Sequence, residues 1–91
     1  ALLGFEFPIP EGAQLSVVGH TANILTPYTV PEARTLLEEA MDAAGFVQVG
    51  EPVERATNEF FYTFQKDERT VTANVFAVVA GKTTIQIGSA K

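Results

Sequence analysis

Three groups of side chains have residue types that could do chemistry, and the first is His20, the only histidine in the chain. As a general base it would need a nucleophile and an orienting carboxylate close by. It lies between Gly19 and Thr21 in a sequence typical of a tight turn, so we interpret it as a polar turn residue. With one histidine and no cysteine, the chain cannot build a metal site on imidazole and thiolate ligands.

Glu38 and Asp42 form the second group, because four residues separate them and one helical turn would bring their carboxylates together. Such a pair could share a divalent cation, but calcium takes about six to eight oxygen ligands and no Asp-rich or Asn-rich loop supplies the others. Arg34, four residues before Glu38, could pair with it on a solvated helix face. We therefore expect no metal site here.

Asp67 and Glu68 form the third group and lie between two basic residues. Two carboxylates act as acid and base inside a cleft, where burial separates their pKa values, and a hairpin tip offers no such burial. Neither Ser16 nor Ser89 lies in a Gly-x-Ser-x-Gly elbow, and the glycines form no phosphate loop or dinucleotide fingerprint. The sequence predicts a protein that is not an enzyme, without catalytic residues or a cofactor.

One amphipathic helix is the clearest element that the sequence predicts. Thr29 followed by Glu32, with Pro31 between them, fits a capping box. Apolar residues then recur at helical spacing, at Ala33, Leu36, Leu37, Ala40, Met41 and Ala44. Gly45 supplies the left-handed position that closes a helix, so we expect the helix over residues 30–44.

A mostly antiparallel sheet of four to six strands should accompany this helix. The expected strands are residues 15–18, 22–28, 46–49, 57–66, 69–79 and 82–88, with 51–56 as a loop. Their alternation gives one consistently apolar face, which can receive the helix, and one face rich in Thr, Gln and Asn. We expect an α+β fold of two strands, one helix and four further strands, with an extended N-terminal arm over 1–13 and one domain over 14–91.

Phe61, Phe76 and Val78 should project from the sheet face opposite the helix. A contiguous apolar patch of this kind often marks an interface. The N-terminal arm, through its apolar residues Phe5, Phe7 and Ile9, could instead fold over the patch and cover it. Both interpretations stay open at this point.

A second group, Phe46, Phe60 and Tyr62, could line a pocket between the helix and a curled sheet. Such a pocket would suit a small ligand or a cell-wall fragment. It is the alternative to a surface that binds protein.

The charge balance argues against two kinds of partner. Eleven acidic residues against six basic ones give a net charge of −5, and no cluster of Lys or Arg occurs. Phosphate backbones and anionic membrane surfaces both attract a concentrated positive surface. No apolar run approaches the roughly 18 residues that a membrane span requires. We expect no nucleic-acid partner and no membrane insertion by this segment.

Short elements of the chain resemble small α+β modules of exported bacterial proteins and lipoproteins of unknown function. They are the lead-in Pro8-Ile9-Pro10-Glu11-Gly12-Ala13, then Tyr28-Thr29 before the helix, Gly45-Phe46 after it, and the segment from Tyr62 to Asp67. The resemblance implies an extracytoplasmic location, in the periplasm or cell envelope, and no known catalysis. The first residue, Ala1, suggests a processed or excised segment.

The spacing Ala33-x3-Leu37-x3-Met41-x3-Gly45-Phe46-Val47 is also similar to the helix-to-strand segment of PASTA domains, which sense the bacterial cell wall. Their Val-Pro-x-Val-x-Gly opening is missing here. Together, these features predict a non-catalytic protein-interaction or structural module, part of a larger exported bacterial protein. It would bind a protein partner or form a homodimer through the second face of the sheet or through a free strand edge. The alternative is a domain that binds a small ligand or a cell-wall fragment.

Overall fold

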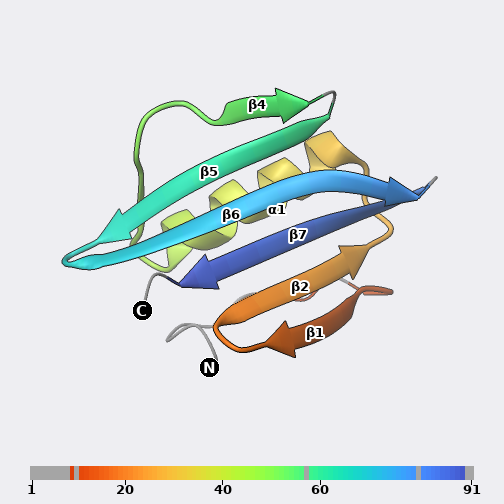
Figure 1. Cartoon of the computed structure of the whole chain (residues 1–91), viewed down its shortest axis with the longest axis horizontal. Helices are drawn as coiled ribbons and strands as arrows, with labels where there is room; N and C mark the ends of the chain where they lie inside the picture. The colour runs from red at the N-terminus through yellow and green to blue at the C-terminus, as the bar shows by residue number, and fades with distance from the viewer. Residues whose placement is uncertain (1–8, 10, 57, 80, 90–91) are drawn as a thin grey trace.

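One helix covers one face of an antiparallel sheet (Figure 1). The computed structural model describes residues 9, 11–56, 58–79 and 81–89, without the side chains of Val78, Val79 and Ser89. The elements in chain order are β1 (Gln14–Val18), β2 (Thr21–Thr26), α1 (Val30–Ala43), β3 (Val47–Gln48), β4 (Val53–Ala56), β5 (Glu59–Lys66), β6 (Arg69–Val79) and β7 (Lys82–Ser89). This arrangement confirms the predicted α+β class and places two strands ahead of the helix.

The described strands lie in the order β1-β2-β7-β6-β5-β3, and β4 also pairs with β5. The sheet has seven strands rather than four to six, because Val53–Ala56 pairs with β5 where we expected a loop. Pairing of β2 with β7 brings the N-terminal hairpin into the same sheet as the C-terminal strands. As a result β1 lies at one side of the sheet, and β3 and β4 lie at the other (Figure 1).

The two ends of α1 form as the sequence predicted. The Thr29 N–H donates to Glu32 Oε1 over 3.0 Å, and the Glu32 N–H donates to Thr29 Oγ1 over 3.3 Å, which completes the capping box. At the other end, Gly45 has a φ of +91°. The Gly45 N–H donates to the Asp42 carbonyl and the Phe46 N–H to the Met41 carbonyl, the two bonds of a Schellman motif.

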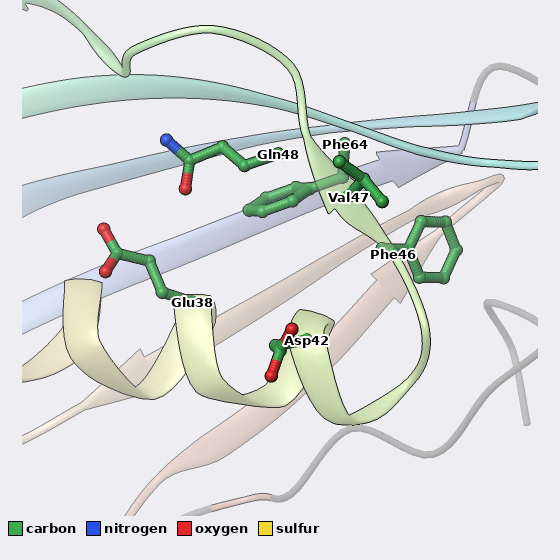
Figure 2. A pocket seen from close by; sticks show the side chains of 6 residues that line it. All are labelled: Glu38, Asp42, Phe46, Val47, Gln48 and Phe64. Carbon is green, nitrogen blue, oxygen red and sulfur yellow. The ribbon is translucent and has the colours of Figure 1, made fainter.

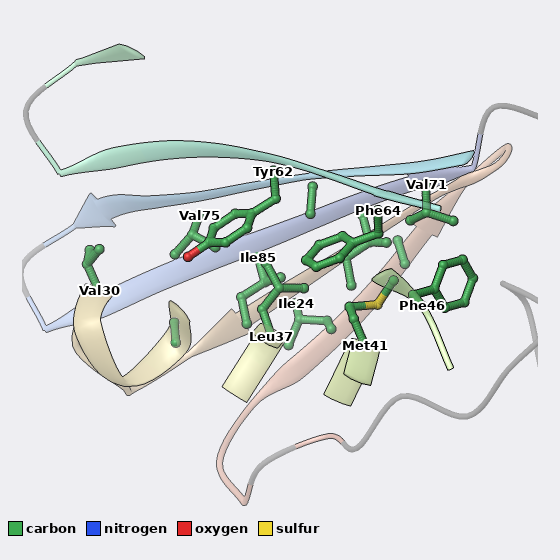
Figure 3. Packing of buried hydrophobic residues seen from close by; sticks show 14 residues of the cluster. Ile24, Val30, Leu37, Met41, Phe46, Tyr62, Phe64, Val71, Val75 and Ile85 are labelled. Carbon is green, nitrogen blue, oxygen red and sulfur yellow. The ribbon is translucent and has the colours of Figure 1, made fainter. Parts of the chain in front are cut away.

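The core lies between α1 and the sheet, as Figure 3 shows. The helix buries Val30, Ala33, Leu37, Ala40 and Met41. The sheet contributes Ala22, Ile24, Tyr62, Phe64, Val71, Ala73, Val75, Ile85 and Ile87. These strand residues alternate with polar ones, so the face that the helix covers is the face that period-two alternation predicted.

Candidate interaction site

The residues that could do chemistry lie apart in the structure. His20 is exposed in the turn between β1 and β2, where Gly19 has a φ of +60°. Asp67 and Glu68 are exposed at the tip of the β5–β6 hairpin, closed by the pair Lys66 and Arg69. Across the described residues, no three His, Asp or Glu side chains gather closely enough to hold a metal ion. In the same part of the chain, no helix has the length and apolarity to cross a membrane.

Tyr62 is the centre of a polar network between β5 and α1. Its side chain is 1% exposed, and its ring stacks on Phe64 with 5.6 Å between the ring centroids. The Tyr62 hydroxyl donates to Glu38 Oε2 over 2.7 Å and accepts from Arg34 Nε over 2.8 Å. Burial raises the pKa of Tyr62 to about 12, and the hydrogen bond from Arg34 opposes that rise. Arg34 and Glu38, which we expected to pair with each other, are thus joined through a strand residue.

Phe60 is engaged by the same network. The guanidinium carbon of Arg34 lies 3.8 Å from the centroid of the Phe60 ring, within the range of a cation–π interaction. Two of the three residues predicted to line a pocket, Phe60 and Tyr62, are therefore occupied by contacts within the chain.

A cavity of about 220 Å³ does lie between α1 and β3 (Figure 2). Its lining residues are Glu38, Asp42, Phe46, Val47, Gln48 and Phe64. Of the predicted pocket residues, Phe46 lines this cavity, whereas Phe60 and Tyr62 do not. The lining groups include the carboxylates of Glu38 and Asp42 on α1, the side-chain amide of Gln48 on β3 and the ring of Phe64.

Phe61 and Phe76 lie half-buried on the sheet face opposite the helix. The guanidinium carbon of Arg55 lies 4.1 Å from the centroid of the Phe61 ring and covers part of it. The side chain of Val78 and the arm residues Phe5 and Phe7 lie outside the described residues, and Ile9 is exposed. Whether the arm or a partner covers this patch stays a prediction.

The outer edge of β1, which is free of any other strand among the described residues, carries the largest group of exposed apolar side chains on one described strand. All five residues of β1 are exposed, and Leu15, Val17 and Val18 keep 48%, 38% and 70% of their surface accessible. Leu15 pairs with Ile24 and Val17 with Ala22, so both lie on the face that the helix covers elsewhere. Because α1 packs on β6 and β7, that face continues past the helix toward β1 (Figure 1).

The opposite edge of the sheet is built differently. β3 has two residues, and β4 has four, with Pro52 before it. The pairing of β4 with β5 shifts register between Glu54 and Ala56, and Arg55 adds a second charge. Short length, charge, proline and a bulge are the features by which natural sheets prevent another strand from pairing at an edge. The five residues of β1 contain no charge, no proline and no bulge, and its pairing with β2 is regular along its whole length.

The sequence led us to expect a free strand edge but not to assign it to β1, although one signal pointed there. Residues 12–31 contain no Asp, Glu, Lys or Arg, so the hairpin of β1 and β2 is the neutral part of an acidic chain. That signal becomes informative only once the strand order shows that β1 is outermost.

No protein-family model matches the chain, and a search of curated proteins finds no match. The resemblance to modules of exported bacterial proteins and to PASTA domains therefore stays a prediction.

Proposed function

We propose that the chain is a non-catalytic interaction module that binds protein by accepting a strand at the free edge of β1. The observation that carries the proposal is the contrast between the two edges of one sheet, which differ in regularity and charge. Successive residues of an antiparallel strand direct their N–H and C=O groups to opposite sides. Every second residue of β1 therefore presents backbone groups that no other described strand pairs with, and main-chain bonds of this kind give affinity in strand addition.

The side chains beside those backbone groups favour a partner that is extended and apolar. Leu15 and Val17 lie on one face of β1 and are both exposed. A partner strand would bury them together with the outward backbone groups. The resemblance of the Pro8–Ala13 lead-in supports a place within a larger exported bacterial protein.

A photoreactive side chain tests the proposal in the cells that make the protein. Benzoylphenylalanine at Val17 should give adducts with a protein partner on irradiation, because Val17 lies on the open edge. The same residue at Arg55, on the opposite edge, is the matched control and should give none. Equal yields at the two positions, or adducts at Arg55 alone, would contradict the assignment of the binding edge to β1.

A second candidate function, binding of a small ligand, is favoured by the cavity beside Phe46. Glu38, Asp42 and the Phe64 ring in its lining suit a cationic group, through charge-assisted hydrogen bonds and a cation–π contact. At about 220 Å³ the cavity is smaller than the roughly 300–1,000 Å³ of typical ligand sites, so the ligand would be a small amine.

Titration of the isotopically labelled chain with butylamine and with amine-bearing cell-wall peptides tests this second candidate by NMR. Saturable shifts of the Phe46 and Gln48 amides, lost in Asp42→Asn, would support it. Shifts that spread evenly over the acidic surface would contradict a ligand site at this cavity, because they would show only weak, nonspecific attraction of the amine to the acidic chain.

A further inference from the structure

We infer that the strand which β1 accepts is the β1 strand of a second copy of this chain, paired antiparallel about a two-fold axis at Ser16. The inference rests on the proposed function and names its partner. Two seven-stranded sheets would then join into one continuous sheet. A two-fold axis is the commonest symmetry of soluble oligomers, and it requires a surface that is complementary to itself.

The sequence Gln14-Leu15-Ser16-Val17-Val18 meets that requirement. Centred on Ser16, antiparallel pairing places Leu15 opposite Val17 of the other copy, and Val17 opposite Leu15. Each exposed apolar side chain on the helix-covered face thus meets another apolar side chain across the axis. On the other face, Gln14 pairs with the 70%-exposed Val18. No residue of β1 is left opposite a turn.

Charge selects this edge for contact between two copies of the same acidic chain. Each copy has a net charge of −5, and like charges repel over the roughly 8 Å Debye length of physiological salt. Residues 12–31 carry none of those formal charges, so two β1 strands can approach without bringing carboxylates together. A strongly basic partner would find no electrostatic attraction at this neutral edge. A second neutral edge would meet no electrostatic repulsion there.

The size of the contact sets the range of concentration in which the dimer forms. One pair of five-residue strands lies below the roughly 1,200 Å² at which stable interfaces begin, so we expect a reversible dimer. Sedimentation equilibrium of the full chain, from about 10 μM to about 1 mM, should show a mass rising from 9.8 kDa toward twice that value.

Val17→Lys should raise the dissociation constant at least tenfold, because a lysine on an edge strand opposes strand pairing. Val53→Lys, on β4 at the opposite edge, is the matched control and should leave the dissociation constant unchanged. Circular dichroism of both variants checks that the fold is retained. Equal weakening by the two lysines would overturn the assignment, because it would show a general effect of charge.

A disulfide tests the register, since the chain has no cysteine of its own. The axis would hold the two Ser16 Cα atoms about 4.5–5.5 Å apart, within the range that a disulfide spans. Ser16→Cys should therefore form a linked dimer on mild oxidation. Gln14→Cys should not, because about 13 Å of strand would separate its two copies. Efficient linkage through Cys at 14 and not at 16 would overturn this register.

The outcomes also separate this inference from the proposed function. A chain that stays monomeric to 1 mM, yet forms adducts with other proteins through Val17, would refute the second copy and leave strand acceptance at β1 standing. A monomer that forms no adduct through Val17 would refute both.

Discussion

The Tyr62 hydroxyl donates a 2.7 Å hydrogen bond to Glu38 Oε2, joining a residue of β5 to a residue of α1. The same oxygen accepts from Arg34 Nε, one turn earlier on the helix. A buried hydroxyl needs such partners, because leaving it unbonded costs about 1–3 kcal/mol. The network fixes the helix along the sheet and closes the part of the helix–sheet boundary where a pocket was predicted.

Replacing Tyr62 by Phe removes the hydroxyl and keeps the ring that stacks on Phe64. We expect the free energy of unfolding to fall by about 1.5–3 kcal/mol, the usual contribution of a hydrogen bond to a charged group. Urea unfolding followed by circular dichroism measures it. Tyr28→Phe is the matched control, because the hydrogen bonds recorded for Tyr28 use its backbone N–H and carbonyl. A Tyr62→Phe variant as stable as Tyr28→Phe would show that the network contributes nothing.

The pKa of Tyr62 predicts how stability changes in alkali. Burial raises this pKa from 10.0 to about 12, so between these values the folded chain keeps a proton that the unfolded chain has lost. The free energy of unfolding should therefore be unaffected by this group below pH 10 and should fall as the pH rises from 10 toward 12. Urea unfolding at pH 9, 10 and 11 should show a smaller decline in Tyr62→Phe than in the unsubstituted chain. Parallel declines would mean that Tyr62 titrates at its ordinary pKa when folded.

Lys66 stabilises the end of α1 from outside the helix. Its Nζ donates to the carbonyl of Ala44 over 2.9 Å, and the last turn of α1 contains no basic residue of its own. A cation near the C-terminal end of a helix contributes about 0.3–1 kcal/mol through the helix dipole. Lys66→Met should lower the free energy of unfolding by about that amount, and the loss should shrink in 1 M salt. Lys82→Met, at the first residue of β7, is the control and should change stability less.

Local features of the sequence predicted local structure well. The capping box at Thr29 and Glu32 and the left-handed Gly45 bound the helix to within one residue of the prediction. The alternation in β5, β6 and β7 identified the buried face, because each strand is long enough to show its period. In both cases the sequence pattern that carries the prediction lies within a few consecutive residues.

The structural features that the sequence did not predict depend on contacts with residues far along the chain. β4 was missed because Pro52 and four mixed residues form a strand only beside β5. The outermost place of β1 follows from the pairing of β2 with β7, which links residues about sixty positions apart in the printed sequence. Arg34 and Glu38 have the spacing of a helical ion pair. In the folded chain both form hydrogen bonds to the hydroxyl of Tyr62, a residue of β5 that lies more than twenty positions away in the sequence.

Two asparagines should respond in opposite directions to the same substitution. Asn74 lies in the middle of β6, and its Oδ1 is buried without a hydrogen-bond partner among the described residues. Asn58 has a φ of +60°, in the left-handed region that asparagine tolerates and β-branched residues do not. Asn74→Thr should raise the free energy of unfolding by about 1 kcal/mol, because it removes an unpaired buried carbonyl and suits a strand. Asn58→Thr should lower it by about 1–2 kcal/mol. Urea unfolding of both variants measures these two changes. A lower free energy of unfolding for Asn74→Thr would contradict the prediction, because it would mean that the Asn74 amide is hydrogen-bonded in solution and that this face of the sheet needs its polarity.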